Sequence, residues 1–430
     1  MTPMSETQSK QTVWLLVFSL VSFGLSFATA ILFARALGAD GYDDYAVAVS
    51  SAVILATLAE MGTGKYALRI MPAYAERGEL SAANGYLRFS AGLILIVSIV
   101  LAVVGVFWEY LEDGEFGNYA LGIVLLFLPV MAWVGAGSEF VTANRAAIRS
   151  AFITRLLVPG STLVLALAWT ISPYQLTAPL GVLCYGAGWL LGLVAVYHFL
   201  QQTTPEEVRA AQAVHRTREW LASIWPFLYF ALLISVLAKV GVIILEFVAT
   251  EEATVAIYSA AAETGTFIYI VAKSTDKLFL PTVSTMLERN DQAGLVVGRR
   301  GRWAWLGSIC VGFLLVVFLF GKDILGLFGP EFVKGYAALC IIAVATAVWT
   351  MASLAPAYLK YIKRRRFVLV GTTLTVLVHV GLCIPLGYHF GATGAALSYA
   401  IPVIVLYLTM AVVATRELRR MNDSDNVLPL

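Results

Sequence analysis

The stretch that decides the fold is residues 13–34, VWLLVFSLVSFGLSFATAILFA, in which no side chain is charged. A helix needs about 20 apolar residues to cross the hydrocarbon core of a bilayer. Such stretches recur along the chain, since 60% of its 430 residues are hydrophobic, 13% are charged and the mean hydropathy is +0.82. A soluble protein carries about twice that share of charge. The sequence therefore predicts an integral membrane protein.

Twelve apolar stretches are long enough to span the membrane, and short polar gaps separate them. They are residues 13–34, 44–64, 86–108, 119–141, 151–171, 178–200, 221–246, 253–280, 302–321, 335–358, 367–388 and 392–415. The gaps are too short to bury a core of their own, which excludes a soluble catalytic domain. We expect an all-α membrane protein with twelve transmembrane helices, six in each of two lobes.

The basic residues alternate from gap to gap, as the positive-inside rule requires of cytoplasmic loops. Basic groups lie before the first span, in every second gap and in the tail: Lys10; Lys65, Arg69, Arg77 and Arg88; Arg145, Arg149 and Arg155; Arg209, Arg216 and Arg218; Lys277, Arg289, Arg299, Arg300 and Arg302; Lys360, Lys363, Arg364, Arg365 and Arg366; Arg416, Arg419 and Arg420. The opposite gaps hold only Arg35, Lys322 and Lys334. Both termini are predicted to be cytoplasmic.

A linker is expected at the midpoint of the chain. Thr204, Pro205, Glu206 and Glu207 have the pattern of a capping box, with Thr204 as N-cap. A short helix should follow, ending near Trp220, and it is either an interfacial helix or an ordinary solvated connector. This divides the chain into a first lobe at 1–200, a linker at 201–220 and a second lobe at 221–430.

Four spans gather polar side chains on one side of the helix. The sets are Thr12, Ser19, Ser22, Ser26 and Thr29; Ser50, Thr57 and Glu60; Ser235, Lys239 and Glu246; and Ser259, Glu263, Thr266, Lys273, Ser274 and Lys277. Hydroxyl stripes also occur where helices simply pack together. Buried charges are costly and favour a wet cavity, most clearly at Lys239 and Glu263. Lys273 and Lys277 lie near the cytoplasmic end, where snorkelling is the alternative.

The four cysteines carry no sign of metal or disulfide chemistry. Cys184, Cys310, Cys340 and Cys383 all fall inside apolar spans and have no paired spacing. We expect them to be small buried hydrophobes, and we expect no metal and no cofactor.

Three blocks in the gaps resemble a known family. They are Ala34-Arg35-Ala36-Leu37-Gly38-Ala39-Asp40-Gly41-Tyr42, Phe328-Gly329-Pro330-Glu331-Phe332 and Gly391-Ala392-Thr393-Gly394-Ala395-Ala396. Their order around twelve spans resembles polysaccharide-biosynthesis (O-antigen) flippases of the Wzx type, in the superfamily that includes multidrug-and-toxin exporters. The resemblance covers essentially the whole chain.

The resemblance implies two six-helix lobes around a central cavity, lined by the first, second, seventh and eighth helices. Cationic side chains there would receive the diphosphate of a polyprenyl-linked sugar, and by position these are Lys239, Lys273 and Lys277. The polar or coupling groups of the cavity would be Glu263, Glu60, Asp276, Ser22, Ser26 and Thr29. The first span has no basic residue before Arg35, so a cation in that helix does not carry over.

The expected function is therefore a flippase of the bacterial inner membrane, and not an enzyme. Its partners would be a lipid-linked oligosaccharide, membrane lipid and polysaccharide polymerase or assembly proteins, with no nucleic acid. One alternative is an organic-cation or multidrug antiporter, for which Glu60, Glu263 and Asp276 supply acids. Another is a membrane-embedded glycan polymerase or acyltransferase, which needs a catalytic base at a leaflet surface.

Overall fold

A computed structural model describes residues 6–113, 120–173, 175–251, 253–273, 276, 279, 292–361 and 364–425. Over these residues the chain forms helices and no β-strand, which confirms the all-α prediction. The first helices are α1 (Glu6–Ala59), α2 (Thr63–Arg77), α3 (Leu80–Asp113), α4 (Ala120–Leu126), α5 (Leu128–Ala143), α6 (Ala147–Phe152), the π-helix η1 (Ile153–Leu157), α7 (Val158–Thr170), α8 (Ala178–Thr203), α9 (Glu206–Ala210) and α10 (Thr217–Val248). Then follow α11 (Thr254–Gly265), α13 (Gln292–Gly326), the 3₁₀ helix η2 (Glu331–Gly335), α14 (Tyr336–Met351), α15 (Ala355–Tyr361) and α16 (Arg365–Asp425).

The helices have the length and composition of membrane spans. Within the described residues, nine helical stretches can cross a bilayer, and α4 with α5, bent by 50°, makes a tenth if counted as one span. Two of the stretches, Val13–Arg77 and Arg365–Glu417, are 65 and 53 residues long, far more than one crossing needs. The chain is thus a multi-pass membrane protein, while the count of twelve crossings stays a prediction.

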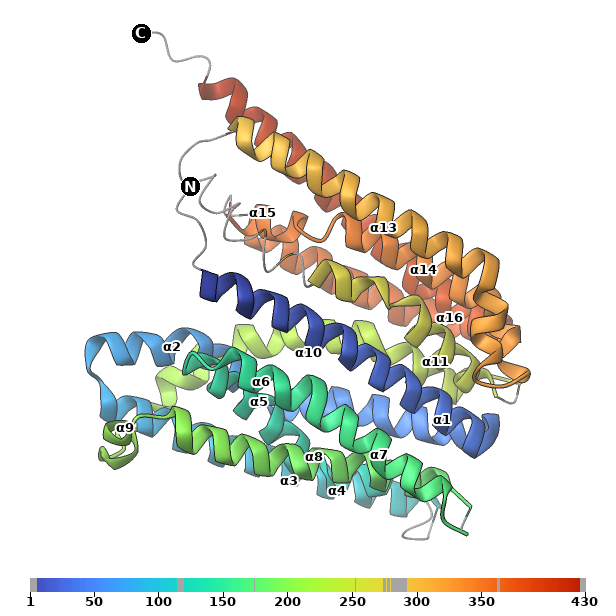
Figure 1. Cartoon of the computed structure of the whole chain (residues 1–430), viewed down its shortest axis with the longest axis horizontal. Helices are drawn as coiled ribbons and strands as arrows, with labels where there is room; N and C mark the ends of the chain where they lie inside the picture. Colours follow the sequence, from blue (N-terminus) through green and yellow to red (C-terminus); the bar gives the residue numbers. More distant parts are fainter. Residues whose placement is uncertain are drawn as a thin grey trace. The chain divides into compact units, whose positions relative to one another are not determined.

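Single glycines turn the two longest helices. Gly38 in α1 has φ 73° and ψ −179°, and Gly391 in α16 has φ 52° and ψ −132°. Side chains are disfavoured at such positive φ, so glycine is the residue suited to these positions. Figure 1 shows α1 reversing its direction. The gap expected between the first two spans is therefore not a loop: the backbone is helical on both sides of one kinked residue.

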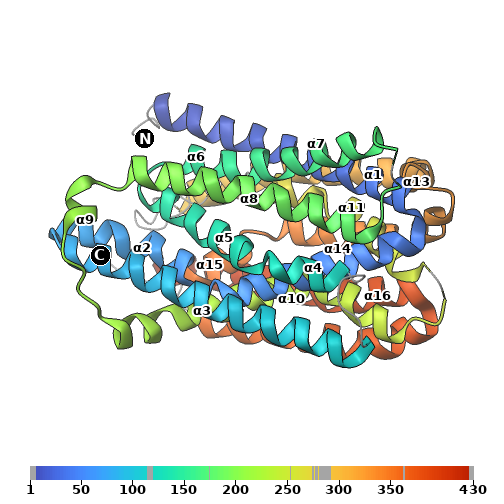
Figure 2. The same ribbon diagram turned by 90° about the horizontal axis from the view of Figure 1, so that it is seen from below.

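The chain packs as two compact units, residues 1–243 and 244–430. In the first unit, α5 lies beside α2, α3 and α8, as Figure 1 and Figure 2 both show. In the second unit, α14 packs against α11, α13 and α16. The boundary falls inside α10, and the expected division into lobes at residues 201–220 stays a prediction.

The capping box expected at the linker is absent. Thr204 is extended, and its hydroxyl accepts a hydrogen bond from Asn144 Nδ2 at 3.1 Å, so it does not cap the helix. Pro205 takes the N-cap position, with φ −53° and ψ 145°. The helix that follows, α9, ends at Ala210, well before the expected end near Trp220. A tertiary contact has replaced the local cap that the sequence pattern predicted.

The rest of the linker is docked on the first unit. Val214 N–H donates to Ser81 O at 3.0 Å, at the start of α3. Arg216 pairs with Glu79 at 2.7 Å, and this carboxylate raises the pKa of the guanidinium. Trp220, fully buried, packs beside the rings of α2 and α3. These contacts fix the start of α10 against α2 and α3.

Candidate functional site

The polar stripe of α1 is partly satisfied by its own backbone. Ser19 Oγ donates to Leu15 O at 2.7 Å, and the buried Thr29 donates to Leu25 O at 2.8 Å. Ser22 is half-buried and Ser26 is exposed. Bonds to the carbonyl four residues earlier let hydroxyls lie in an apolar helix at little cost. Among the four stripe residues whose side chains the structure describes, Ser26 is the exposed one.

The stripes of the second and seventh spans meet inside the first unit. Thr57 Oγ1 contacts Ser235 Oγ at 3.2 Å and also donates to Val53 O at 2.8 Å. Lys239 follows Ser235 by four residues, so both occupy the same side of α10. The Lys239 side chain is half-buried. The structure therefore brings together two polar stripes that the sequence analysis had described separately.

Glu60 lies at the break between α1 and α2. Its backbone carbonyl accepts from the Thr63 hydroxyl at 2.8 Å. Its carboxylate fills the space above Gly135 of α5, because a Cβ built on that glycine would lie 2.0 Å from Glu60 Oε1. The carboxyl group also interacts electrostatically with Lys65 and Glu139. Glu60 thus belongs to a group of three ionisable residues, Glu60, Lys65 and Glu139, which we call the Glu60 cluster.

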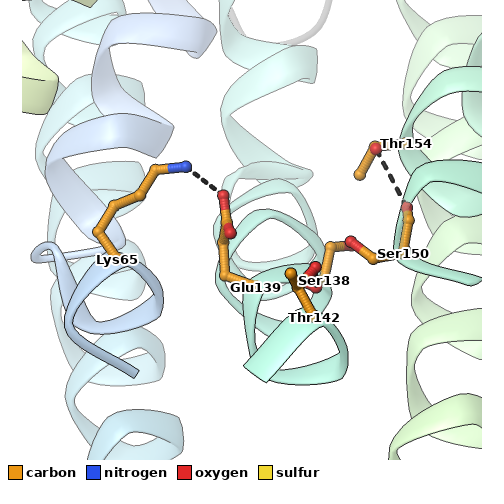
Figure 3. Close-up of polar contacts among 6 residues, drawn as sticks. All are labelled: Lys65, Ser138, Glu139, Thr142, Ser150 and Thr154. Atoms are coloured by element: carbon orange, nitrogen blue, oxygen red, sulfur yellow. Dashed lines mark hydrogen bonds and ion pairs between the residues drawn. The ribbon is translucent and has the colours of Figure 1, made fainter. Parts of the chain in front are cut away.

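The ion pair in the Glu60 cluster joins α2 to α5. Lys65 Nζ donates to Glu139 Oε1, and the two side chains are 48% and 24% exposed. Figure 3 shows this pair on one side of α5 and Ser138 on the other side, facing Ser150 of α6. Glu139 was not among the residues predicted from the sequence, and Lys65 was predicted only as a cytoplasmic charge. A carboxylate inside the predicted span 119–141 was the available signal.

Glu263, Lys273 and Lys277 are three of the predicted residues of the second unit, and the structure describes the first two. Glu263 of α11 is half-buried, and each hydroxyl of its neighbours Thr264 and Thr266 donates to the carbonyl four residues earlier. Lys273 is exposed, with Nζ 5.6 Å from the centre of the Tyr269 ring. Lys277 lies outside the described residues.

Asp276 is held in a network within the second unit. It pairs with Arg302 of α13 and accepts from Ser353 Oγ at 2.9 Å. Arg302 also donates to Ser353 at 2.9 Å, and its guanidinium lies 5.5 Å from the Phe279 ring. The Arg302 side chain is 2% exposed. Asp276, a predicted polar or coupling group of the cavity, is the counter-ion of the buried Arg302, and its role in the cavity stays a prediction.

Metal binding has no candidate in the part of the chain that the structure describes. No three His, Cys, Asp or Glu side chains gather there closely enough to hold a metal ion.

Comparison with known proteins decides the family. Residues 9–286 match the family described as polysaccharide biosynthesis protein. The chain belongs to this family. No curated protein matches it significantly. The match covers all of α1 through α11 except the first residues of α1. It includes the first of the three sequence blocks, residues 34–42, and confirms the family resemblance.

This polysaccharide biosynthesis protein has the fold of MATE transporters. It is similar to an inward-facing multidrug resistance MATE family transporter of the MOP superfamily, with 13% identity, 96% of this chain and 99% of that chain covered, and a TM-score of 0.75. An outward-facing structure of such a transporter gives 13% identity, 96% and 95% coverage and a TM-score of 0.64. A third similar structure is a MOP superfamily transporter from Pyrococcus furiosus, described as having a binding pocket of reverse polarity. The identity is 15%, 96% of this chain and 96% of that chain are covered, and the TM-score is 0.62. At these identities the likeness shows the fold, which is the two-lobed transporter fold.

Proposed function

We propose that this polysaccharide biosynthesis protein is a flippase for a polyprenyl-diphosphate-linked oligosaccharide, a precursor of polysaccharide or O-antigen. It would act in the bacterial inner membrane, beside polysaccharide polymerase or assembly proteins. The observation that carries the proposal is the family match over residues 9–286 on a chain with a transporter fold. A diphosphate with several sugars cannot cross about 30 Å of hydrocarbon unaided.

Alternating access moves the headgroup while the polyprenyl tail stays in the bilayer. Similar proteins described as inward-facing and outward-facing support such a cycle for this fold. Lys239, Lys273 and Lys277 are the proposed diphosphate partners, since lysine ammonium groups bind phosphate as point charges. Ser22, Ser26 and Thr29 would supply hydroxyls along the path of the sugars.

Acidic residues are the proposed coupling groups. A carboxylate at membrane depth holds a proton, a cation or an ion-pair partner. In the Glu60 cluster two carboxylates share one lysine, so one negative charge is left for a proton or a cation. Glu263 is the second proposed coupling group. Asp276 has Arg302 as counter-ion and would couple only by releasing it.

The excess negative charge of the Glu60 cluster also favours a second function. A cation exporter needs acidic side chains on its substrate path, and the neighbouring MATE structures are described as multidrug transporters. The two functions separate by substrate. A flippase transports a diphosphate lipid, and its loss leaves resistance to organic cations unchanged. A cation exporter does not transport the diphosphate lipid, and its loss lowers resistance to organic cations.

Deletion of the gene tests the proposal directly. In a strain that still synthesises the lipid-linked oligosaccharide, we expect the precursor to accumulate on the cytoplasmic side, protected from a glycosidase added outside the inner membrane. A plasmid copy of the full chain should restore its exposure. Unchanged exposure in the deletion strain, or lost resistance to organic cations without accumulation, would overturn the flippase function.

A further inference from the structure

A guanidinium group from another helix is bonded to the first span. Arg155 lies in η1, and its Nη1 donates to Leu15 O of α1 at 2.8 Å and to Ser19 Oγ. Pro159 explains the π-helical turn, because proline has no N–H to bond the carbonyl of Arg155 four residues earlier and its ring crowds that carbonyl. The sequence therefore accounts for the π-helical turn in which Arg155 lies.

The contact lies at the level of the lipid headgroups on the predicted cytoplasmic side. Trp14, next to Leu15, is 54% exposed, and tryptophan concentrates at the boundary between headgroups and hydrocarbon. Arg149 is exposed and bonds Gln202 at 3.2 Å. Arg155 follows Arg149 by six residues, about 9 Å further along a helix that enters the membrane. Its guanidinium is therefore expected close to that boundary, within reach of the phosphates on its headgroup side.

The charge of Arg155 is not balanced by a carboxylate among the described residues. Two other cations of the membrane helices do have acidic partners: Lys65 pairs with Glu139, and Arg302 pairs with Asp276. Arg155 instead bonds a carbonyl and a hydroxyl, both neutral, through one nitrogen. The guanidinium has five N–H donors. With Nη1 turned to α1, the parallel donors of Nε and Nη2 keep the fork geometry that matches two oxygens of a phosphate.

From these observations we infer that Arg155 is a phosphate-binding residue on the first span, which takes the diphosphate of the lipid-linked substrate from the cytoplasmic leaflet. The inference rests on the proposed function and adds a residue to it. It also answers a gap in the sequence analysis, in which the first span had no cation of its own before Arg35. Here the first span, residues 13–34, obtains a positive charge from η1, because none of its own side chains is basic. Ser19, in the polar stripe, acts as a positioning residue for that charge.

Binding of a polyprenyl diphosphate without sugars tests the inference. The full chain is purified in nanodiscs of phosphatidylcholine, and dissociation constants are measured for wild type, Arg155→Gln and Arg155→Lys. We expect Arg155→Gln to weaken binding about tenfold or more, as loss of a charge-assisted bidentate contact implies. Arg155→Lys should lose less, because it keeps the charge but not the fork. Ser19→Ala should stay within about threefold of wild type, and Arg149→Gln, an exposed arginine six residues away, should be unchanged.

Other outcomes of these measurements distinguish failure of the proposed function from failure of the inference about Arg155. If wild type does not bind the diphosphate lipid, the proposed function fails and the inference falls with it. If wild type binds and Arg155→Gln binds equally well, only the inference fails. A third arm adds phosphatidylglycerol as competitor. If it displaces the diphosphate from wild type at matched concentration, Arg155 is a general contact for phospholipid and the inference is overturned. Thermal unfolding of each variant identifies misfolding. If Arg155→Gln is misfolded, the test rests on Arg155→Lys, and wild-type binding by that variant overturns the inference.

Discussion

Replacing Gly135 by alanine should move a charge without unfolding the protein. The added Cβ would lie 2.0 Å from Glu60 Oε1 and 2.9 Å from its Cδ. Ordinary contact begins at 3.4 Å, so the carboxylate has to withdraw by about 1.4 Å. The atoms in the way are the end of a flexible side chain, which can rotate. Gly135 lies within α5, where alanine is favoured over glycine by about 0.5–1 kcal/mol.

The expected result is a loss of transport with little loss of stability. The gain in helix propensity offsets the cost of a less favourable Glu60 rotamer, about 0.5–1.5 kcal/mol. We expect a melting temperature within about 4 °C of wild type. Two unit charges about 4 Å apart lose about 1 kcal/mol of interaction when they separate by about 1.4 Å at an effective dielectric of about 20, and we take this as the scale of the effect. If Glu60 couples transport, its rate should fall about fivefold.

Transport is measured as the appearance of lipid-linked oligosaccharide outside the inner membrane in the deletion strain, at matched protein levels. Gly92→Ala in α3 is the control, because a Cβ there meets nothing within 4 Å. Glu60→Asp shortens the acid by one methylene, so Gly135→Ala with Glu60→Asp should transport better than Gly135→Ala alone. Wild-type transport by Gly135→Ala, or an equal loss in Gly92→Ala, would refute the coupling role of the Glu60 carboxylate.

Three further predictions concern the substrate path, the packing of the linker and the topology. Lys239→Ala should abolish export while the protein stays at its normal level in the membrane, and Lys239→Arg should keep part of the export. Lys322→Ala, which replaces a lysine on the predicted outer side, is the control and should export normally. Normal export by Lys239→Ala would show that this lysine is structural. Trp220→Phe removes a buried indole N–H that donates to a tyrosine hydroxyl of α2 at 2.9 Å. It should cost about 1–2 kcal/mol and lower the melting temperature of the purified protein by about 1–2 °C. A reporter active only outside the cytoplasm should be active after Glu112 and inactive after Arg365, and activity after Arg365 would mean that the spans of the second half are miscounted.

The fold was predictable because its main signals are local. Apolar runs of span length predict membrane helices. The kinks at Gly38 and Gly391 fall in gaps that separate predicted spans, although the sequence did not predict their geometry. The two failures have different causes, one local and one tertiary. A gap containing polar residues predicts a loop, but one glycine at positive φ is enough to reverse α1 without one. Thr204 has the sequence of an N-cap, but Asn144, sixty residues earlier, engages its hydroxyl.

The candidate site was predictable as faces of single helices and not as contacts between them. Helical periodicity placed Ser235 on the same side as Lys239, but only the fold shows that Thr57 meets that side. Likewise, the sequence predicted Arg155 only as one of the basic residues on the cytoplasmic side, because it lies near the end of its span. Its partner, Ser19, is 136 residues away in sequence, and no spacing rule connects them.

The charged groups of the membrane helices differ in what they can do during alternating access. The pair Lys65–Glu139 lies wholly in the first unit, and Asp276–Arg302 lies wholly in the second. A rigid-body movement of one unit leaves such internal pairs intact, so they stabilise each unit and cannot by themselves report which way the protein faces. A substrate phosphate gains most from a cation that no internal carboxylate already neutralises. Arg155 meets that condition within the described residues, which is why its replacement should affect binding of the diphosphate more than replacement of either paired cation.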